Sequence, residues 1–166
     1  MTDAPRFLLD SNVFMEAARR YYAFDLLPQF WAALIEQAQA KRLLSIDRVK
    51  EEIARGKDDL ADWAKGEFSF AFASTDRPEV IQEFKRLMGW VNGQDQFFPF
   101  AKEEFAQVAD GWLVAFAKVE GLTLVTHEQL EPQTRKRVPI PNVCKVAGVH
   151  WVDTFQMLRA LGVRFT

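Results

Sequence analysis

Several acidic side chains occupy positions from which they could bind a metal ion together. Three of them follow apolar runs that read as buried strands: Asp10 after FLL, Glu128 shortly after LTLV, and Asp153 after VHWV. In an open parallel sheet, ligands bind beyond the carboxyl ends of the strands. A carboxylate at such a place is costly to remove from water unless something pairs with it. We therefore expect these acids to share one edge of a sheet with whatever neutralises them.

A fourth acid, Glu52, belongs to a helix that the sequence predicts over residues 48–55. Val49 and Ile53 mark the apolar stripe of this helix. At about 100° per residue, Glu52 lies roughly 60° from Val49, on the border of the stripe, and Glu51 lies about 160° from it. We therefore expect Glu52 to face the protein interior and Glu51 to face solvent.

A fifth acid, Asp110, opens a helix that the sequence predicts over residues 109–120. It shares a face with Leu113, Val114 and Ala117, so it heads an apolar stripe. An acid in the first turn of a helix packed on a sheet points toward the edge of that sheet. We expect Asp110 to lie near the strand-end carboxylates.

Carboxylates that converge on one poorly solvated edge repel one another by several kcal/mol. Raised pKa values or a bound cation relieve this repulsion. All-oxygen donors favour Mg²⁺ or Mn²⁺ over zinc, and a single cysteine, Cys144, excludes a thiolate-rich zinc site. Such ions activate water and neutralise charge on a scissile phosphate. This pattern predicts metal-dependent phosphoryl chemistry, with Asp10 as a metal ligand.

Each acid also has a purely structural interpretation. An aspartate after a strand often caps a helix or forms a turn. Asp153 has Gln156 three residues later, the spacing of a capping box, so it stays an outer candidate. Asp110 could simply favour a helix N-terminus through the macrodipole. No single acid decides between the two interpretations.

The elements that must position these acids alternate between strand and helix, which indicates a parallel sheet covered on both sides. The segment 68–73 is ambiguous. Phe97, Phe98 and Phe100 in DQFFPF could stack on bases, but a loop that plugs the core is the favoured interpretation. Asp76 and Glu79 have capping-box spacing at the start of a helix over 78–90. Strands are expected over residues 6–9, 43–46, 122–125 and 149–152, and further helices over 13–22, 26–41, 58–65, 143–147 and 154–161.

The composition fits one globular domain over residues 1–166. The chain is 49% hydrophobic, and its formal net charge of -2 argues against a protein whose whole surface binds nucleic acid. The N-terminus has no signal-peptide pattern, and no apolar run approaches the roughly 18 residues that a membrane span needs. We expect a cytoplasmic protein with no membrane partner.

The order of LLDSN, KEEI and ADGWLVAFAKVEGLTLVTHE resembles the PIN-domain ribonucleases. The segment IPNVCKVAGVHWVDTFQML further resembles a poorly characterised prokaryotic PIN subfamily. The resemblance implies an α/β/α sandwich with a central parallel sheet of about four or five strands. It implies polar groups around the site at Ser11, Asn12 and Thr126. It implies that the metal-binding and catalytic acids are Asp10, Glu52, Asp110 and Glu128, the last standing where Asp is commoner.

Small members of this family resembling VapC are often toxins, which implies an RNA substrate, a small antitoxin partner and a homodimer. An aromatic-rich first helical hairpin, with Tyr21 and Tyr22, could be covered by such a partner or serve the core. RNA binding needs positive charge near the acids. The expected substrate-binding residues are Arg135, Lys136, Arg137, Asn12 and Thr126, with Arg48 and Lys50 as further cations.

These inferences together predict a metal-dependent endoribonuclease, and two alternatives stay open. One is a non-catalytic PIN-like module that binds RNA or protein, in which Asp10→Asn would leave the activity intact. The other is a phosphotransfer or phosphatase domain with Asp10 as nucleophile. Dehalogenase-type phosphatases need a second aspartate two residues on, and position 12 is Asn.

Overall fold

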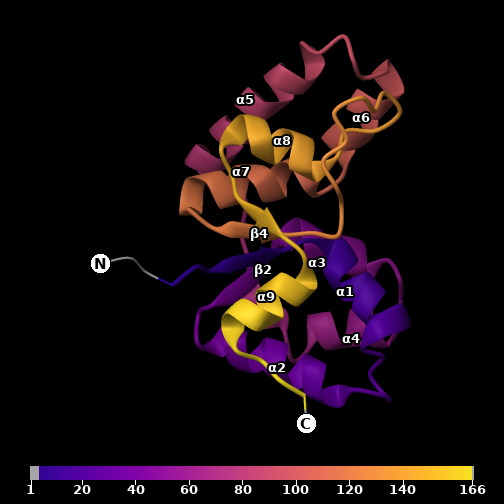
Figure 1. Ribbon diagram of the computed structural model, residues 1–166, viewed down its shortest axis with the longest axis vertical. Helices are drawn as coiled ribbons and strands as arrows, with labels where there is room; N and C mark the ends of the chain where they lie inside the picture. Colours follow the sequence, from indigo (N-terminus) through magenta and orange to yellow (C-terminus); the bar gives the residue numbers. More distant parts are fainter. Residues whose placement is uncertain (1–3, 166) are drawn as a thin grey trace.

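The computed structural model, which describes residues 4–165, contains one parallel sheet between two layers of helices (Figure 1). Its five strands have the order β3-β2-β1-β4-β5, and each neighbouring pair is parallel. The predicted α/β/α sandwich is confirmed. The strands are β1 (Phe7–Leu9), β2 (Leu43–Ile46), β3 (Phe72–Ala73), β4 (Thr123–Val125) and β5 (Trp151–Val152).

The central strand β1 is buried on both faces because helices cover both sides of the sheet. Phe7, Leu8 and Leu9 are all at most 2% exposed. Leu8 is in register with Leu44 of β2 and with Leu124 of β4. Such continuous apolar strands are typical of parallel sheets. The chain order reverses between β1 and β4, which is where open α/β sheets bind ligands.

The helices form two layers that Figure 1 shows above and below the sheet. The upper layer contains α5 (Pro78–Asn92), α6 (Pro99–Gln107), α7 (Asp110–Glu120) and α8 (Ile140–Ala147). The lower layer contains α1 (Ser11–Glu16), α2 (Pro28–Gln39), α4 (Asp59–Lys65) and α9 (Thr154–Leu161), and α3 (Asp47–Ala54) packs against α1 and α4. A π-helical turn, Ala17–Tyr21, continues α1, and a 3-10 turn, Ser69–Ala71, precedes β3.

Helix α6 was not predicted from the sequence. Phe97 is buried, as expected of a plug, but a helix begins two residues later at Pro99. Proline suits the first helical position because its fixed φ is helical and its missing N–H would be unbonded there. The exposed helix carries Phe100 and Glu104 to the surface of the upper layer.

The predicted capping box at the start of α5 is wrong. The N-cap residue of this helix is Arg77, and no side chain caps it. Glu79 instead accepts hydrogen bonds from the Arg77 guanidinium, with a shortest distance of 2.6 Å. The C-terminus of α7 does end as its sequence predicts, because Gly121 adopts the left-handed φ of 68° that glycine tolerates best.

Within residues 4–165, no helix combines the length and the apolar character that crossing a bilayer requires.

Candidate active site

Asp10 lies at the carboxyl end of β1, where the sheet order reverses, and is held from several sides. Its side chain is almost fully buried, at 1% exposure. The Thr126 hydroxyl donates to Asp10 Oδ2 at 3.0 Å, and the Ser11 hydroxyl lies 3.4 Å from Oδ1. The Asp10 amide donates to the carbonyl of Val125 at 3.0 Å, which ties the end of β1 to β4. The carboxylate is therefore fixed at the centre of the sheet edge.

Among the described residues, no cationic side chain offsets the burial of the Asp10 carboxyl in its effect on the pKa. Burial raises its pKa to about 7, and the nearby Glu128 and Glu52 carboxylates act in the same direction. The Thr126 hydrogen bond and the Asn12 backbone amide partly oppose the rise in pKa. These effects fit a carboxyl that is placed in the interior next to other acids.

Glu52 faces the same region from α3, as its helical position predicts. Its side chain is half-buried and the neighbouring Glu51 is exposed. Glu52 Oε1 is buried and has no hydrogen-bond partner within the described residues. Burial raises the pKa of Glu52, and the Ala109 backbone and the Ser11 hydroxyl partly oppose this. An unpartnered buried carboxylate oxygen is an uncommon and costly feature.

Asp110 is the first residue of α7 and completes the acid cluster. Burial raises its pKa well above the ordinary value, and repulsion from Asp10, Glu128 and Glu52 adds to the rise. The positive charge of Arg137 partly offsets these effects. The sequence placed these four acids at one edge of the sheet, and their mutual electrostatic effects show that they do lie together.

Glu128 differs from the other acids because its carboxylate already has partners. Its Oε1 accepts from Arg137 Nη2 at 2.6 Å and from the backbone amide of Ile140 at 3.0 Å. Its own amide donates to the Thr126 hydroxyl at 3.1 Å. Thr126 therefore links Asp10 to Glu128, and the Arg137 loop folds back over the acids.

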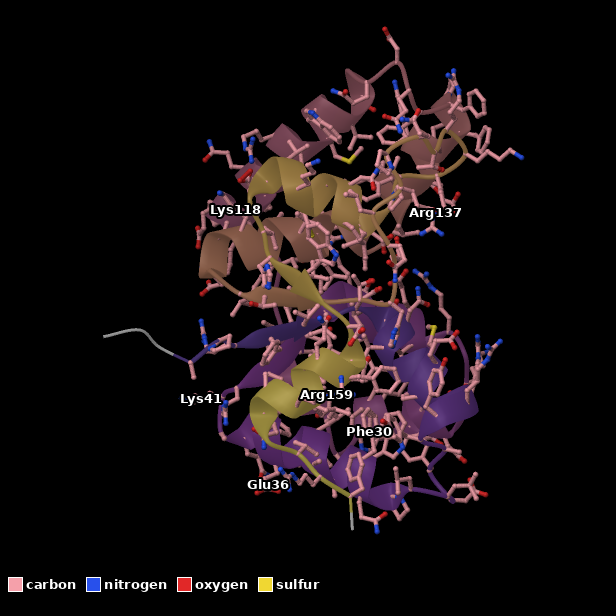
Figure 2. All side chains as sticks on the ribbon, in the orientation of Figure 1. Phe30, Glu36, Lys41, Lys118, Arg137 and Arg159 are labelled. Atoms are coloured by element: carbon pink, nitrogen blue, oxygen red, sulfur yellow. The ribbon has the colours of Figure 1, made fainter. Side chains whose placement is uncertain are left out.

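A cavity of about 400 Å³ opens over this cluster. Glu52, Asp110, Glu128 and Arg137 line it, and α6 contributes Glu104 to the wall. In Figure 2, Arg137 lies at the right-hand edge between the two helix layers, whereas Lys41 and Lys118 lie on the left. Glu104 was missed because α6 was not predicted from the sequence, and the segment was interpreted as a loop. The other lining residues are Ser11, Asn12, Met15, Ala101, Phe105, Val108 and Val138.

The polar residues predicted to contact substrate fall into two groups. Asn12 is exposed in the cavity wall. Thr126 is 2% exposed, and both Asp10 and the Glu128 amide use its hydroxyl, so its contacts in the structure are with the acid cluster. Its role as a substrate contact stays a prediction. Ser11 is likewise buried beside Asp10.

The predicted basic residues are also separated by the structure. Arg137 lines the cavity, whereas Arg135 and Lys136 are exposed outside its wall. The Arg135 guanidinium lies 5.0 Å from the centre of the Phe98 ring. Arg48 is engaged in the fold, because its Nε donates to Thr75 at 3.0 Å and its guanidinium covers the Trp112 ring at 3.8 Å.

Asp153 caps α9. Its Oδ1 accepts from the Gln156 amide at 2.8 Å, and Gln156 Oε1 accepts from the Asp153 amide at 2.9 Å. This reciprocal pair confirms the capping-box interpretation. The side chain is thereby committed to the helix terminus, and it does not line the acid cavity.

The acids fit a hard divalent cation in their chemistry, but they do not form a finished metal centre. Among residues 4–165, no three acidic, histidine or cysteine side chains are grouped so as to hold a metal ion. Asp10, Glu52 and Asp110 nevertheless offer only oxygen donors, and the buried Glu52 Oε1 has no partner. A cation would offset the burial that raises the pKa of all three, and the repulsion that adds to the rise for Asp10 and Asp110. The donor set therefore suits Mg²⁺ or Mn²⁺ once the side chains converge on it.

Comparisons with known proteins extend over nearly the whole chain. A family described as a domain of unknown function, DUF4411, matches residues 7–165. No curated protein sequence matches the chain.

Three solved structures share the fold at low sequence identity. FitAcB from Neisseria gonorrhoeae is 17% identical, with a TM-score of 0.53 over 87% of this chain and 95% of that one. FitAB bound to an IR36 DNA fragment is 16% identical, with a TM-score of 0.52 over 89% and 94%. VapBC2 from Rickettsia felis, bound to a DNA fragment from its promoter, is 12% identical, with a TM-score of 0.53 over 89% and 97%. At these identities the likeness concerns the fold.

Proposed function

The chain belongs to the DUF4411 family and has a PIN-like fold, and from this premise we propose that it is a metal-dependent endoribonuclease that hydrolyses RNA phosphodiester bonds. One observation carries the proposal: carboxylates from four separate segments gather where the sheet order reverses, and three of them, Glu52, Asp110 and Glu128, line one cavity. They come from the end of β1, from α3, from α7 and from the loop after β4, at Asp10, Glu52, Asp110 and Glu128. Structural capping does not explain the convergence of Asp10, Glu52 and Asp110, since none of these three makes a side-chain cap within the described chain. Glu128 does accept a hydrogen bond from the Ile140 amide at the start of α8.

The residues that would hold Mg²⁺ or Mn²⁺ are Asp10, Glu52 and Asp110. Glu128 would join them if its carboxylate left Arg137. When bound, such an ion supplies an activated water and neutralises charge on the phosphate. The raised pKa values of Asp10 and Asp110 support the need for an ion. They mean that the charged carboxylates are unfavourable in this environment, and a bound cation stabilises the charged form.

The other side chains of the cavity have roles that follow from their contacts. Thr126 fixes the orientation of Asp10, because its hydroxyl donates to Oδ2. Arg137 is 53% exposed and borders the acids, so its guanidinium can reach a phosphate oxygen of a bound strand. Asn12 is exposed in the same wall and can donate or accept a hydrogen bond.

We also propose that the chain is the toxin of a toxin–antitoxin pair, with a small antitoxin protein and a homodimer as its assemblies. The resemblance to VapC-like proteins and the shared fold with VapBC2 support this. The first helical hairpin offers a surface for a partner, because Tyr21 is 54% exposed and Leu26 is 76% exposed. Phe30 and Trp31 of the same hairpin are buried and serve the core. Light scattering of the purified chain, alone and with a candidate antitoxin, tests these assemblies.

The nuclease proposal is tested by incubating the purified chain with labelled single-stranded and hairpin RNAs in Mg²⁺, in Mn²⁺ and in EDTA. Asp10→Asn is the test variant. Asp153→Asn is the matched control, because it changes a strand-end aspartate outside the cavity and asparagine caps helices well. We expect cleavage that needs the metal, that is lost in Asp10→Asn and that persists in Asp153→Asn.

A different result separates the alternatives. If the wild-type chain leaves every RNA intact with either metal, the endoribonuclease proposal is wrong. RNA or protein binding that Asp10→Asn leaves unchanged would then identify a non-catalytic PIN-like module.

A further inference from the structure

An exposed cluster of aromatic and basic side chains lies beside the acid cavity. We call Phe98, Phe100, Arg135 and Lys136 the aromatic–basic platform. The Phe98 and Phe100 rings are 5.7 Å apart between their centres, and the Arg135 guanidinium lies 5.0 Å from the Phe98 ring. Phe100 is 55% exposed, which is high for a phenylalanine, and Lys136 is exposed on the same loop as Arg135. The acid site described above does not use this platform.

The two segments that form the platform are fastened to each other. The Phe98 amide donates to the carbonyl of Arg135 at 2.9 Å. The Gln96 side chain donates to the carbonyls of Pro132 at 2.8 Å and Thr134 at 2.6 Å. These bonds join the start of α6 to the loop after β4, so the rings and the cations are held together before any ligand arrives. Such preorganisation lowers the entropic cost of binding.

Helix α6 and the loop after β4 each carry both a platform residue and a residue that lines the acid cavity. Phe100 and Glu104 are four residues apart on α6 and therefore share one face, one turn from each other. Glu104 lines the acid cavity. On the loop, Arg137 lines the cavity and Arg135 lies two residues before it. An RNA strand that runs from the acid cavity across this wall would contact Phe100 on one side and Arg135 and Lys136 on the other.

We propose that the aromatic–basic platform binds an unpaired nucleotide of single-stranded RNA next to the bond at the acid site. Phe100 stacks on the base, and Arg135 and Lys136 contact the phosphates beside it. This inference rests on the proposed function and names the form of RNA that the site takes. A base that is paired and stacked in a duplex has no free face to offer, so the platform selects single strands.

Charge complementarity and position favour RNA over a protein as the occupant. Exposed cations next to an exposed aromatic ring match the alternation of phosphate and base along a single strand. Phe70 is exposed to the same extent, 54%, but lies in a groove with Arg6 and Lys41. Those residues precede β1 and β2, so this groove is at the opposite edge of the sheet from the acids. Phe70 is therefore a matched control.

The test measures binding without cleavage. Fluorescence anisotropy of labelled single-stranded RNA is recorded in EDTA at low salt, with the wild-type chain, Phe100→Ala, Phe100→Trp and Phe70→Ala. A blunt RNA duplex and a single strand with abasic sites at its centre are the comparison probes. We expect Phe100→Ala to weaken single-strand binding by about tenfold, and Phe100→Trp and Phe70→Ala to bind as the wild type does. Wild type and Phe100→Ala should bind the abasic strand with equal affinity.

The inference is overturned if Phe100→Ala binds the single strand as tightly as wild type, or if its loss of affinity is equal for the duplex. It is also overturned if Phe100→Ala changes only the self-association of the chain in light scattering, which would make this face a protein interface. Because binding is measured in EDTA, its outcome is independent of cleavage. If Phe100 contributes to RNA binding but no metal-dependent cleavage occurs, the platform proposal stands and the endoribonuclease proposal is wrong. If cleavage occurs but Phe100→Ala does not change binding, the endoribonuclease proposal stands and the platform proposal is wrong.

Discussion

Arg137 is hydrogen-bonded to Glu128 at 2.6 Å and brings the only positively charged side chain to the wall of the acid cavity within residues 4–165. The pair joins two ends of one loop across nine residues. It neutralises one acid of the cluster and leaves Asp10, Glu52 and Asp110 to repel one another. The Arg137 guanidinium therefore offsets part of the negative charge of the acids, as a bound cation would also do.

Replacing this guanidinium should strengthen metal binding. In Arg137→Gln, Glu128 loses its charged partner and keeps the Ile140 amide, and Asp110 loses a nearby positive charge that lowers its pKa. Both changes increase the attraction of the cavity for a cation, and we expect Mn²⁺ to bind about three- to tenfold more tightly at pH 8. Titration followed by Mn²⁺ electron paramagnetic resonance measures the affinity without any RNA.

The matched control for this prediction is Lys136→Gln. It removes the same charge from the neighbouring position, outside the cavity wall. We expect this variant to keep the wild-type Mn²⁺ affinity. Equal affinities for wild type and Arg137→Gln would show that the guanidinium does not compete with the metal.

The raised pKa of Asp10 should make the metal-free protein lose stability as the pH rises. The pKa is about 7 in the folded chain and near the ordinary aspartate value of 3.8 in the unfolded one. Between these values the folded state keeps a proton that the unfolded state has lost, so the free energy of unfolding falls with increasing pH. The fall is about 1.4 kcal/mol for each unit of pKa difference, as an upper bound.

Asp10→Asn should remove this contribution, because asparagine stays neutral. In urea denaturation with EDTA, we expect the variant to gain about 1–3 kcal/mol relative to wild type on going from pH 5 to pH 8. Asp25→Asn, which changes an exposed aspartate, is the control variant. A parallel pH dependence of Asp10→Asn and wild type would contradict the raised pKa.

Thr126 should tune the acid site through its hydroxyl. Thr126→Val keeps the shape of the side chain but removes the bond to Asp10 and the acceptor for the Glu128 amide. The Thr126 bond lowers the pKa of Asp10, so its loss should raise that pKa further. We expect the pH midpoint of Mn²⁺ binding to rise by about half a unit to one unit, and stability at pH 8 to fall by about 1–3 kcal/mol.

Thr123→Val is the control on the strand that leads into Thr126. Thr123 makes no side-chain hydrogen bond within the described chain and lies three residues before Thr126, at the start of β4. If the pH midpoint of Mn²⁺ binding rises equally in both variants, the effect comes from a general change in β4. If the midpoint changes in neither variant, the Thr126 hydroxyl does not affect the acid site.

The acid positions were predictable because they depend on local periodicity and on strand ends. Glu52 was separated from Glu51 by helical geometry alone, and the structure leaves Glu51 exposed and Glu52 half-buried. Asp10 was identified because an apolar run stops at a carboxylate, and a parallel sheet gathers such ends at one edge. Glu128 was identified from its place shortly after the apolar run at residues 122–125, and the family resemblance then assigned it to the metal-binding acids.

The remaining features depend on tertiary contacts that a sequence pattern does not contain. The segment Phe97–Phe100 mixes a core residue with surface residues, and only its packing shows that Phe97 is buried and Phe100 exposed. The Arg137–Glu128 pair needs the loop after β4 to fold back on itself. Arg48 was a candidate RNA contact by sequence, but Thr75, 27 residues later, holds it in the fold.

Gly111 should be required for the wall of the acid cavity, since α7 passes close to two rings at this point. A Cβ atom at Gly111 would lie 2.9 Å from Phe84 and 3.1 Å from Phe105, and Phe105 lines the cavity. Gly111→Ala must displace these rings or move α7 together with the adjacent Asp110. We expect urea denaturation to show a loss of about 1–3 kcal/mol, with weaker Mn²⁺ binding. Gly89→Ala is the matched control, because no atom lies within 4 Å of its added Cβ and it sits inside α5. This control should be stabilised by about 0.5–1 kcal/mol through helix propensity and should keep its Mn²⁺ affinity, whereas a Gly111→Ala variant as stable as wild type would contradict the close approach.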